Sequence, residues 1–98
     1  MGKVLIIDDE KQILNLLSRI IGLEGYDVLQ ATSFKAGIKQ VEQHDPEVIL
    51  CDVYLPDGSG VALVSEIKRL RPLSEVILLT AHGNIPDGVQ AIKNGAFD

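Results

Sequence analysis

Short apolar runs alternate with amphipathic stretches along the whole chain, and this alternation limits the fold more than any other feature of the sequence. The runs are rich in aliphatic and β-branched side chains and stop abruptly at polar residues. This pattern is typical of strands that are buried on both faces of a parallel sheet. We expect strands at residues 3–7, 26–30, 48–52 and 76–80.

Apolar side chains recur at helical spacing in the stretch that follows each strand. The first helix is expected over about residues 10–21, while Ser33 and Asn84 are suitable N-terminal caps for the second and fourth helices. Four repeats of a strand followed by a helix predict an α/β domain with a doubly wound, open parallel sheet. The expected buried helix faces are Ile13, Leu14, Leu17, Ile20 and Ile21; Phe34, Ile38 and Val41; Leu63, Val64, Ile67 and Leu70; and Val89 and Ile92.

Length and composition restrict what the chain can bind and where it works. Its 98 residues suffice for one domain, and a hydrophobic fraction of 46% supports a real core. The net charge of −5 disfavours direct contact with nucleic acid or with an anionic membrane. Cys51 is the only cysteine, and its apolar neighbours indicate a buried thiol rather than a reactive one. Since the sequence shows no signal peptide and no membrane span, we expect a cytoplasmic protein.

Acidic residues and a hydroxyl stand where the expected strands end. Asp8 and Asp9 follow the first strand, Asp52 ends the third, and Thr80 ends the fourth. In open parallel sheets the ligand crevice lies outside the carboxyl ends of the strands, so we expect these side chains to converge. Carboxylates that pack together repel one another unless a cation joins them. An all-oxygen ligand set favours Mg²⁺, and the lack of His or Cys at these ends disfavours zinc.

This grouping indicates phosphoryl-transfer chemistry. A carboxylate beside magnesium can attack a phosphoryl group and form an aspartyl phosphate, a role that suits Asp52. Thr80 could then hydrogen-bond a phosphoryl oxygen. Simpler structural roles stay open: Asp8 or Asp9 as the cap of the first helix, Asp52 as the start of a loop, and Thr80 as an ordinary strand residue.

The motifs that carry these residues resemble the response-regulator receiver domains of two-component signal transduction. They are VLIIDDE at 4–10, VILCD at 48–52, LPDGSG at 55–60, VILLTA at 76–81 and GAFD at 95–98. The stretch AHGN at 81–84 is similar to the nitrogen-regulator-like subgroup, whose output is an ATPase that acts on an alternative sigma factor. The resemblance implies a flavodoxin-like sheet and a signalling switch rather than an enzyme, apart from help with its own phosphorylation and dephosphorylation.

Site roles and partners also follow from the resemblance. It implies that Asp8 and Asp9 hold Mg²⁺, that Asp52 is both a metal ligand and the phosphoacceptor, and that Tyr54 adds its backbone carbonyl to the ion. Thr80 would be the switch hydroxyl. The partners implied are a sensor histidine kinase, which supplies the phosphoryl group, and an output domain or downstream protein that controls transcription.

One departure from the family pattern concerns the end of the chain. Receivers continue into a fifth strand that bears a phosphoryl-contacting Lys, and then into a fifth helix, whereas this sequence stops at Asp98. We therefore expect residues 1–98 to form a single receiver domain that lacks the last strand–helix unit. The fourth strand would then be an exposed edge, which favours homodimers through that edge or through swapped elements.

Two alternative functions remain open from the sequence. One is a module that is not phosphorylated and simply dimerises, because the phosphoryl-contacting Lys is missing. The other is a Mg²⁺-dependent phosphatase of the haloacid-dehalogenase type, which also works through an aspartyl phosphate. That family needs a second acid two residues after the nucleophile, where this chain has Tyr54.

Overall fold

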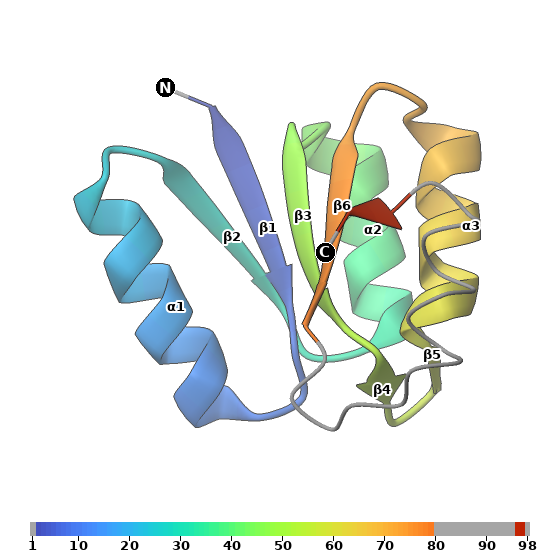
Figure 1. Ribbon diagram of the computed structural model, residues 1–98, viewed down its shortest axis with the longest axis horizontal. Helices are drawn as coiled ribbons and strands as arrows, with labels where there is room; N and C mark the ends of the chain where they lie inside the picture. Colours follow the sequence, from blue (N-terminus) through green and yellow to red (C-terminus); the bar gives the residue numbers. More distant parts are fainter. Residues whose placement is uncertain (1, 80–95, 98) are drawn as a thin grey trace.

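A parallel sheet with helices on both faces makes up the computed structural model, which describes residues 2–79 together with Ala96 and Phe97 (Figure 1). The strands of this sheet are β1 (Lys3–Ile7), β2 (Asp27–Ala31), β3 (Val48–Asp52), β6 (Glu75–Leu79) and β7 (Ala96–Phe97). The helices are α1 (Lys11–Leu23), α2 (Phe34–His44) and α3 (Gly60–Leu70). A small antiparallel hairpin is formed by β4 (Tyr54–Leu55) and β5 (Gly58–Ser59).

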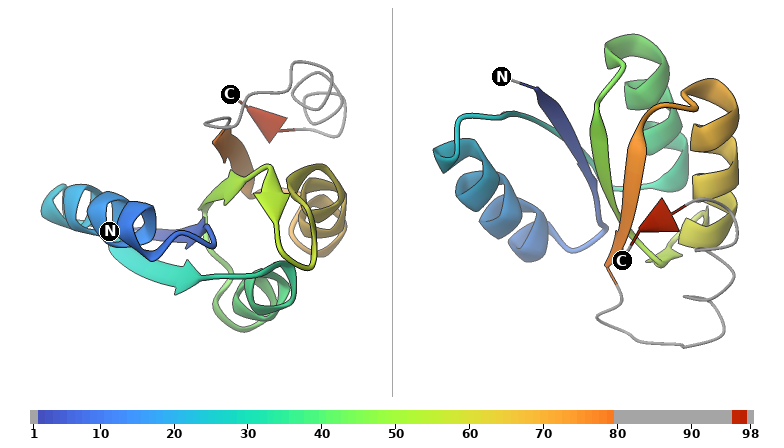
Figure 2. Two further views of the ribbon diagram at one scale, coloured as in Figure 1. Left: turned by 90° about the horizontal axis from the view of Figure 1, so that it is seen from below. Right: turned by 45° about the horizontal axis from the view of Figure 1, so that its top comes forward.

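The strand order in the sheet is β2-β1-β3-β6-β7, and every neighbouring pair is parallel. If the five strands of this sheet are numbered along the chain, their order is 2-1-3-4-5, which is the order of flavodoxin-like, doubly wound folds. Helix α1 covers one face, whereas α2 and α3 lie side by side on the other (Figure 2). The predicted fold class is therefore confirmed.

Strand β1 shows why a continuous apolar run suits this position. Successive side chains of a strand point to opposite faces of the sheet. Leu5 and Ile7 join the buried cluster beneath α2 and α3, while Val4 and Ile6 join the cluster beneath α1. Both faces of β1 are thus covered, and the strand has no solvent face on which polar residues could alternate.

Most element boundaries agree with the sequence prediction to within about two residues. Strand β2 lies one residue later than expected, and α1 continues to Leu23, so Gly22 lies inside this helix. Gly25, with φ of 94°, makes the turn that follows. Ile20 was expected on the buried face of α1 but is 50% exposed.

Two further expectations were incomplete. Residues 55–60 were expected to be a plain loop, yet they take part in the β4–β5 hairpin, in which Tyr54 pairs with Ser59. The sheet was expected to lack a fifth strand and to leave the outer edge of β6 exposed, and this was wrong, because the short strand β7 pairs with β6 at Val76 and Ile77. The expected fourth helix and Thr80 lie outside the described residues. Within those residues, no helix is long and apolar enough to cross a membrane.

Replacing Ile49 by Ala should destabilise the domain strongly. Ile49 is fully buried in β3 within the cluster beneath α2 and α3, so its removal leaves a cavity. We expect the free energy of unfolding to fall by about 2–5 kcal/mol in urea denaturation. Leu73→Ala is the control, because Leu73 is 97% exposed and its truncation should cost less than about 0.5 kcal/mol. Equal losses in the two variants would contradict this description of the core.

Candidate phosphoacceptor and metal site

The carboxyl edge of the sheet gathers three aspartates between β1 and β3. Ile7 pairs with Cys51 in the parallel register, so Asp8 and Asp52 leave the two strands at the same level. One carboxylate oxygen from each of Asp8, Asp9 and Asp52 lies within 4.8 Å of the others. The chain continues from β1 to one side of the sheet and from β3 to the other, which makes this the switch point where ligands bind in such folds.

Two members of this acidic cluster are buried. Asp8 is 3% exposed and Asp52 is 4% exposed, whereas Asp9 lies at the surface. The Asp8 side chain accepts a hydrogen bond from the backbone N–H of Glu10 (2.8 Å), and the Asp52 side chain accepts one from the N–H of Tyr54 (3.1 Å). Each carboxylate is thus oriented by the backbone two residues further along the chain.

The hydrogen bond that the N–H of Glu10 donates shows whether Asp8 or Asp9 simply caps helix α1. The N-cap of α1 is Glu10 itself, and its side chain makes no capping hydrogen bond. Asp8 therefore makes a local turn before the helix rather than capping it, and Asp9 is not the capping residue either.

The backbone after Asp52 is packed closely against the start of α3. The N–H of Gly60 donates to the carbonyl of Val53 (2.6 Å). A Cβ at position 60 would lie 2.5 Å from the backbone oxygen of Asp52 and 2.7 Å from Cα of Val53. Only glycine fits this approach without moving the backbone that carries the site.

Cys51 lies directly beneath the acidic cluster and is fully buried. Burial raises the pKa of its thiol well above the usual range, and the negative charges of Asp52 and Asp8 raise it further. The thiol donates to the backbone carbonyl of Asp52 (3.2 Å). Cys51 is therefore a protonated packing residue, as the sequence predicted, and not a nucleophile.

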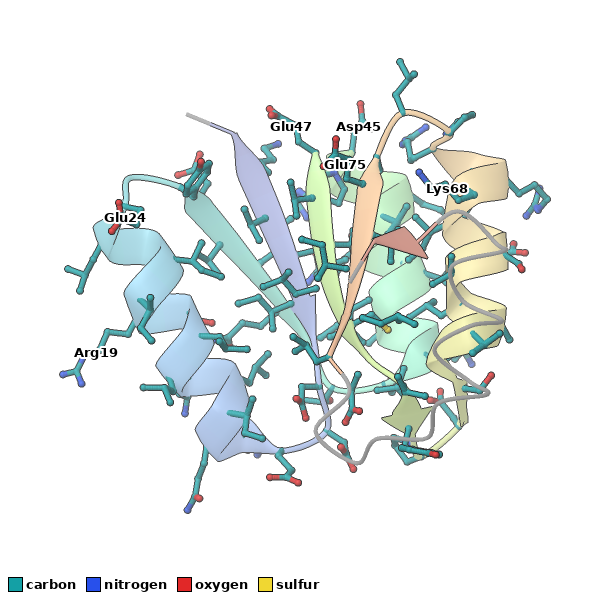
Figure 3. All side chains as sticks on the ribbon, viewed as in Figure 1. Arg19, Glu24, Asp45, Glu47, Lys68 and Glu75 are labelled. Carbon is teal, nitrogen blue, oxygen red and sulfur yellow. The ribbon has the colours of Figure 1, made fainter. Side chains whose placement is uncertain are left out.

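A second group of charged residues lies at the opposite edge of the sheet, and one ion pair there joins two helices. Asp45, Glu47 and Glu75 lie together where β3 and β6 begin, far from the acidic cluster (Figure 3). Arg71 forms an ion pair with Asp45 (3.1 Å), and its guanidinium also donates to the carbonyl of Glu42 (3.1 Å). These contacts attach the end of α3 to the end of α2.

Comparison with known proteins decides the family. The family model of the response regulator receiver domain matches residues 4–98 of the chain. The chain belongs to this family. Receiver domains are signalling switches rather than classical enzymes, and they interact with histidine kinases.

This receiver domain is similar to several regulators and to solved receiver structures. The beryllofluoride-activated receiver domain dimer of NtrC4 is 40% identical, with a TM-score of 0.92 over 100% of this chain and 81% of that one. A response regulator from Burkholderia pseudomallei, solved with a phosphorylated aspartic acid and a calcium ion, is 31% identical with a TM-score of 0.92, over 98% of this chain and 56% of that one. The response regulator protein PilR of Pseudomonas aeruginosa is 38% identical over 98% of this chain, which spans 22% of the length of PilR.

The structure brings together most of the residues that the sequence singled out. The carboxylates of Asp8, Asp9 and Asp52 converge. The backbone N–H of Tyr54 donates a hydrogen bond to Asp52. Thr80 lies outside the described residues. Sequence reasoning missed Asp57, which accepts two backbone hydrogen bonds from the start of α2. It also missed the close packing of Gly60, for which the Gly-Ser-Gly run gave only a turn signal.

Replacing Gly60 by Ala should distort the backbone that carries Asp52. The new methyl group has no room, so we expect the free energy of unfolding to fall by about 1–3 kcal/mol and the amide resonances of Asp52 and Val53 to shift. Gly22→Ala is the control, because a Cβ there would meet no atom within 4 Å. That variant lies in a helix and should be neutral or stabilising by up to about 1 kcal/mol. Urea denaturation and amide spectra that failed to separate the two variants would contradict the proposed packing.

Proposed function

We propose that this receiver domain accepts a phosphoryl group from a sensor histidine kinase onto Asp52, with Mg²⁺ held by Asp8, Asp9 and Asp52. The observation that carries the proposal is the acidic cluster, whose carboxylate oxygens lie within 4.8 Å of one another at the switch point of the sheet. The phosphorylated aspartic acid in the Burkholderia pseudomallei regulator supports the same chemistry in a related chain.

The ligand set fits a hard divalent cation. The cluster offers carboxylate oxygens from three residues, and oxygen ligands are those that Mg²⁺ prefers. The bond from the N–H of Tyr54 to Asp52 keeps the Tyr54 backbone beside the cluster, which supports the Tyr54 carbonyl as a further ligand. When bound, the ion supplies positive charge that offsets the charge of the phosphoryl oxygens.

The residues of the chain account for the transfer itself. A carboxylate oxygen of Asp52 forms a bond to phosphorus while the bond between phosphorus and the kinase imidazole breaks, and the electron pair leaves on the imidazole nitrogen. Burial of Asp52 limits the access of water to the acyl phosphate that results. Thr80 is proposed as the hydroxyl that responds to the phosphoryl group, and the same site would assist hydrolysis of the acyl phosphate.

The wider role follows from the relatives. Among them are transcriptional regulatory proteins such as GlrR of Escherichia coli, of whose length this chain spans 21%. We therefore propose that the domain controls transcription in the cytoplasm through an output domain or a downstream protein, without binding DNA itself.

Modification of Asp52 tests the proposal. With Mg²⁺ and acetyl phosphate, the native chain should gain the mass of one phosphoryl group, and chelation of the ion should prevent this. The Asp52→Asn variant should gain nothing, because the amide is not a nucleophile. Asp27→Asn is the control, because Asp27 is an exposed acid of β2 away from the cluster, and this variant should be modified like the native chain.

The same measurement separates the alternatives. A native chain that gains no mass would favour the module that is not phosphorylated. A mass gain that persists in Asp52→Asn would show that another residue is the phosphoacceptor. Steady turnover of added phosphate esters would favour the phosphatase, which the family match and Tyr54 at the position of the second acid argue against.

We also propose that the chain self-associates through the β6 side of the sheet. In the described part of the chain, β7 covers this edge only at Val76 and Ile77, and unpaired strand edges favour pairing with another chain. The activated NtrC4 receiver is a dimer, which supports association in this family. Light scattering behind size exclusion should give a mass that rises from one chain toward two with concentration. A constant monomer mass would refute the proposal.

A further inference from the structure

Asp57 links two parts of the fold that are far apart in sequence. It lies in the turn between β4 and β5, and its carboxylate accepts hydrogen bonds from the backbone N–H groups of Phe34 (2.6 Å) and Lys35 (3.1 Å). Phe34 and Lys35 begin α2, and they lie 23 and 22 positions before Asp57 in the chain. Each oxygen of Asp57 therefore has its own partner in another element.

The start of α2 explains why these bonds form. The first N–H groups of a helix have no partner within the helix. Ser33, the N-cap residue, accepts from Ala36 (3.1 Å), which leaves the N–H groups of Phe34 and Lys35 to Asp57. A negative charge at this end is also favoured by the helix dipole, and the two hydrogen bonds lower the pKa of Asp57.

Packing keeps the hairpin against the helix in a definite place. A Cβ at Gly58 would lie 2.6 Å from Cδ2 of the Phe34 ring, so the β4–β5 backbone approaches this ring very closely. The carboxylate bonds and the ring contact act on neighbouring residues of the same turn. Together they fix both the distance and the orientation of the hairpin relative to α2.

The other end of the hairpin belongs to the acidic cluster. Tyr54 pairs with Ser59 across the hairpin, and its N–H donates to the Asp52 carboxylate (3.1 Å). Gly60, which follows Ser59, donates its N–H to the carbonyl of Val53 (2.6 Å) and begins α3. A displacement of the turn at Asp57 is therefore transmitted to the backbone of Tyr54 through a hairpin of only two paired positions.

We propose that Asp57 is a positioning residue of the phosphoacceptor site, which holds the β4–β5 hairpin to α2 and thereby fixes the Tyr54 backbone beside Asp52. This inference rests on the proposed function, because the Tyr54 carbonyl and the Asp52 carboxylate are the groups offered to Mg²⁺. Asp57 is not a member of the acidic cluster. It acts through the hairpin.

Mg²⁺ titration of variants tests this role. In Asp57→Ala, both bonds to α2 are lost, and we expect the dissociation constant for Mg²⁺ to rise about tenfold, the low end of the range for groups that orient metal ligands. Asp57→Asn keeps one oxygen that can accept from Phe34 and should show an intermediate affinity. An unchanged affinity in Asp57→Ala would overturn the proposal.

Ser33→Ala is the matched control. It removes a cap from the same helix end but leaves the hairpin bonds intact, so it should lower the melting temperature while the Mg²⁺ dissociation constant stays within about twofold of the native value. If Ser33→Ala weakened Mg²⁺ binding as much as Asp57→Ala, the effect would be one of α2 stability, and positioning by Asp57 would be refuted.

Metal-free spectra separate this inference from the proposed function. Without Mg²⁺, Asp57→Ala should shift the amide resonances of Tyr54 and Gly60, and Ser33→Ala should leave them in place. If the native chain bound no Mg²⁺, the proposed function would fail, but the amide shifts would still support the link from Asp57 to Tyr54. Tyr54 and Gly60 resonances that did not move in Asp57→Ala would overturn it.

Discussion

Carboxylates that are held together away from water repel strongly when both are ionised, and the carboxyl edge of this sheet holds Asp8 and Asp52 buried and close together. Neither residue can turn away easily, because β1 and β3 are paired neighbours whose residues next to the aspartates, Ile7 and Cys51, are fully buried. Their carboxylates are also fixed by backbone N–H groups two residues further on. The fold thus imposes an arrangement that a bound cation stabilises, and the chemistry proposed for Asp52 depends on it.

The parts of the fold that the sequence predicts well are those whose signal is local and repeated. Strand β1 was placed correctly because its apolar run stops at Asp8, and the cap of α2 was found because Ser33 stands just before the helical spacing begins. The meeting of Asp8, Asp9 and Asp52 could also be predicted, since parallel strands bring their carboxyl ends to one edge. No distance was needed for that inference.

The parts that the sequence did not predict depend on contacts between distant segments. The β4–β5 hairpin has two paired positions, too few for an alternating pattern to appear. Asp57 looked like an ordinary turn residue, because nothing near it in sequence identifies the start of α2 as its partner. Ile20 matched the helical spacing of a buried residue, but it stays half exposed, because helical spacing alone does not show how much of a helix face the rest of the fold covers.

The single thiol has a consequence for how the domain can be observed. Cys51 is sealed beneath the acidic cluster, and its pKa is raised, so in the folded state it is both unreachable and protonated. It becomes a nucleophile only when β3 is exposed to solvent. The chain therefore carries a native chemical reporter of unfolding at its centre. A cysteine introduced at the surface could be labelled with a dye without first removing this one.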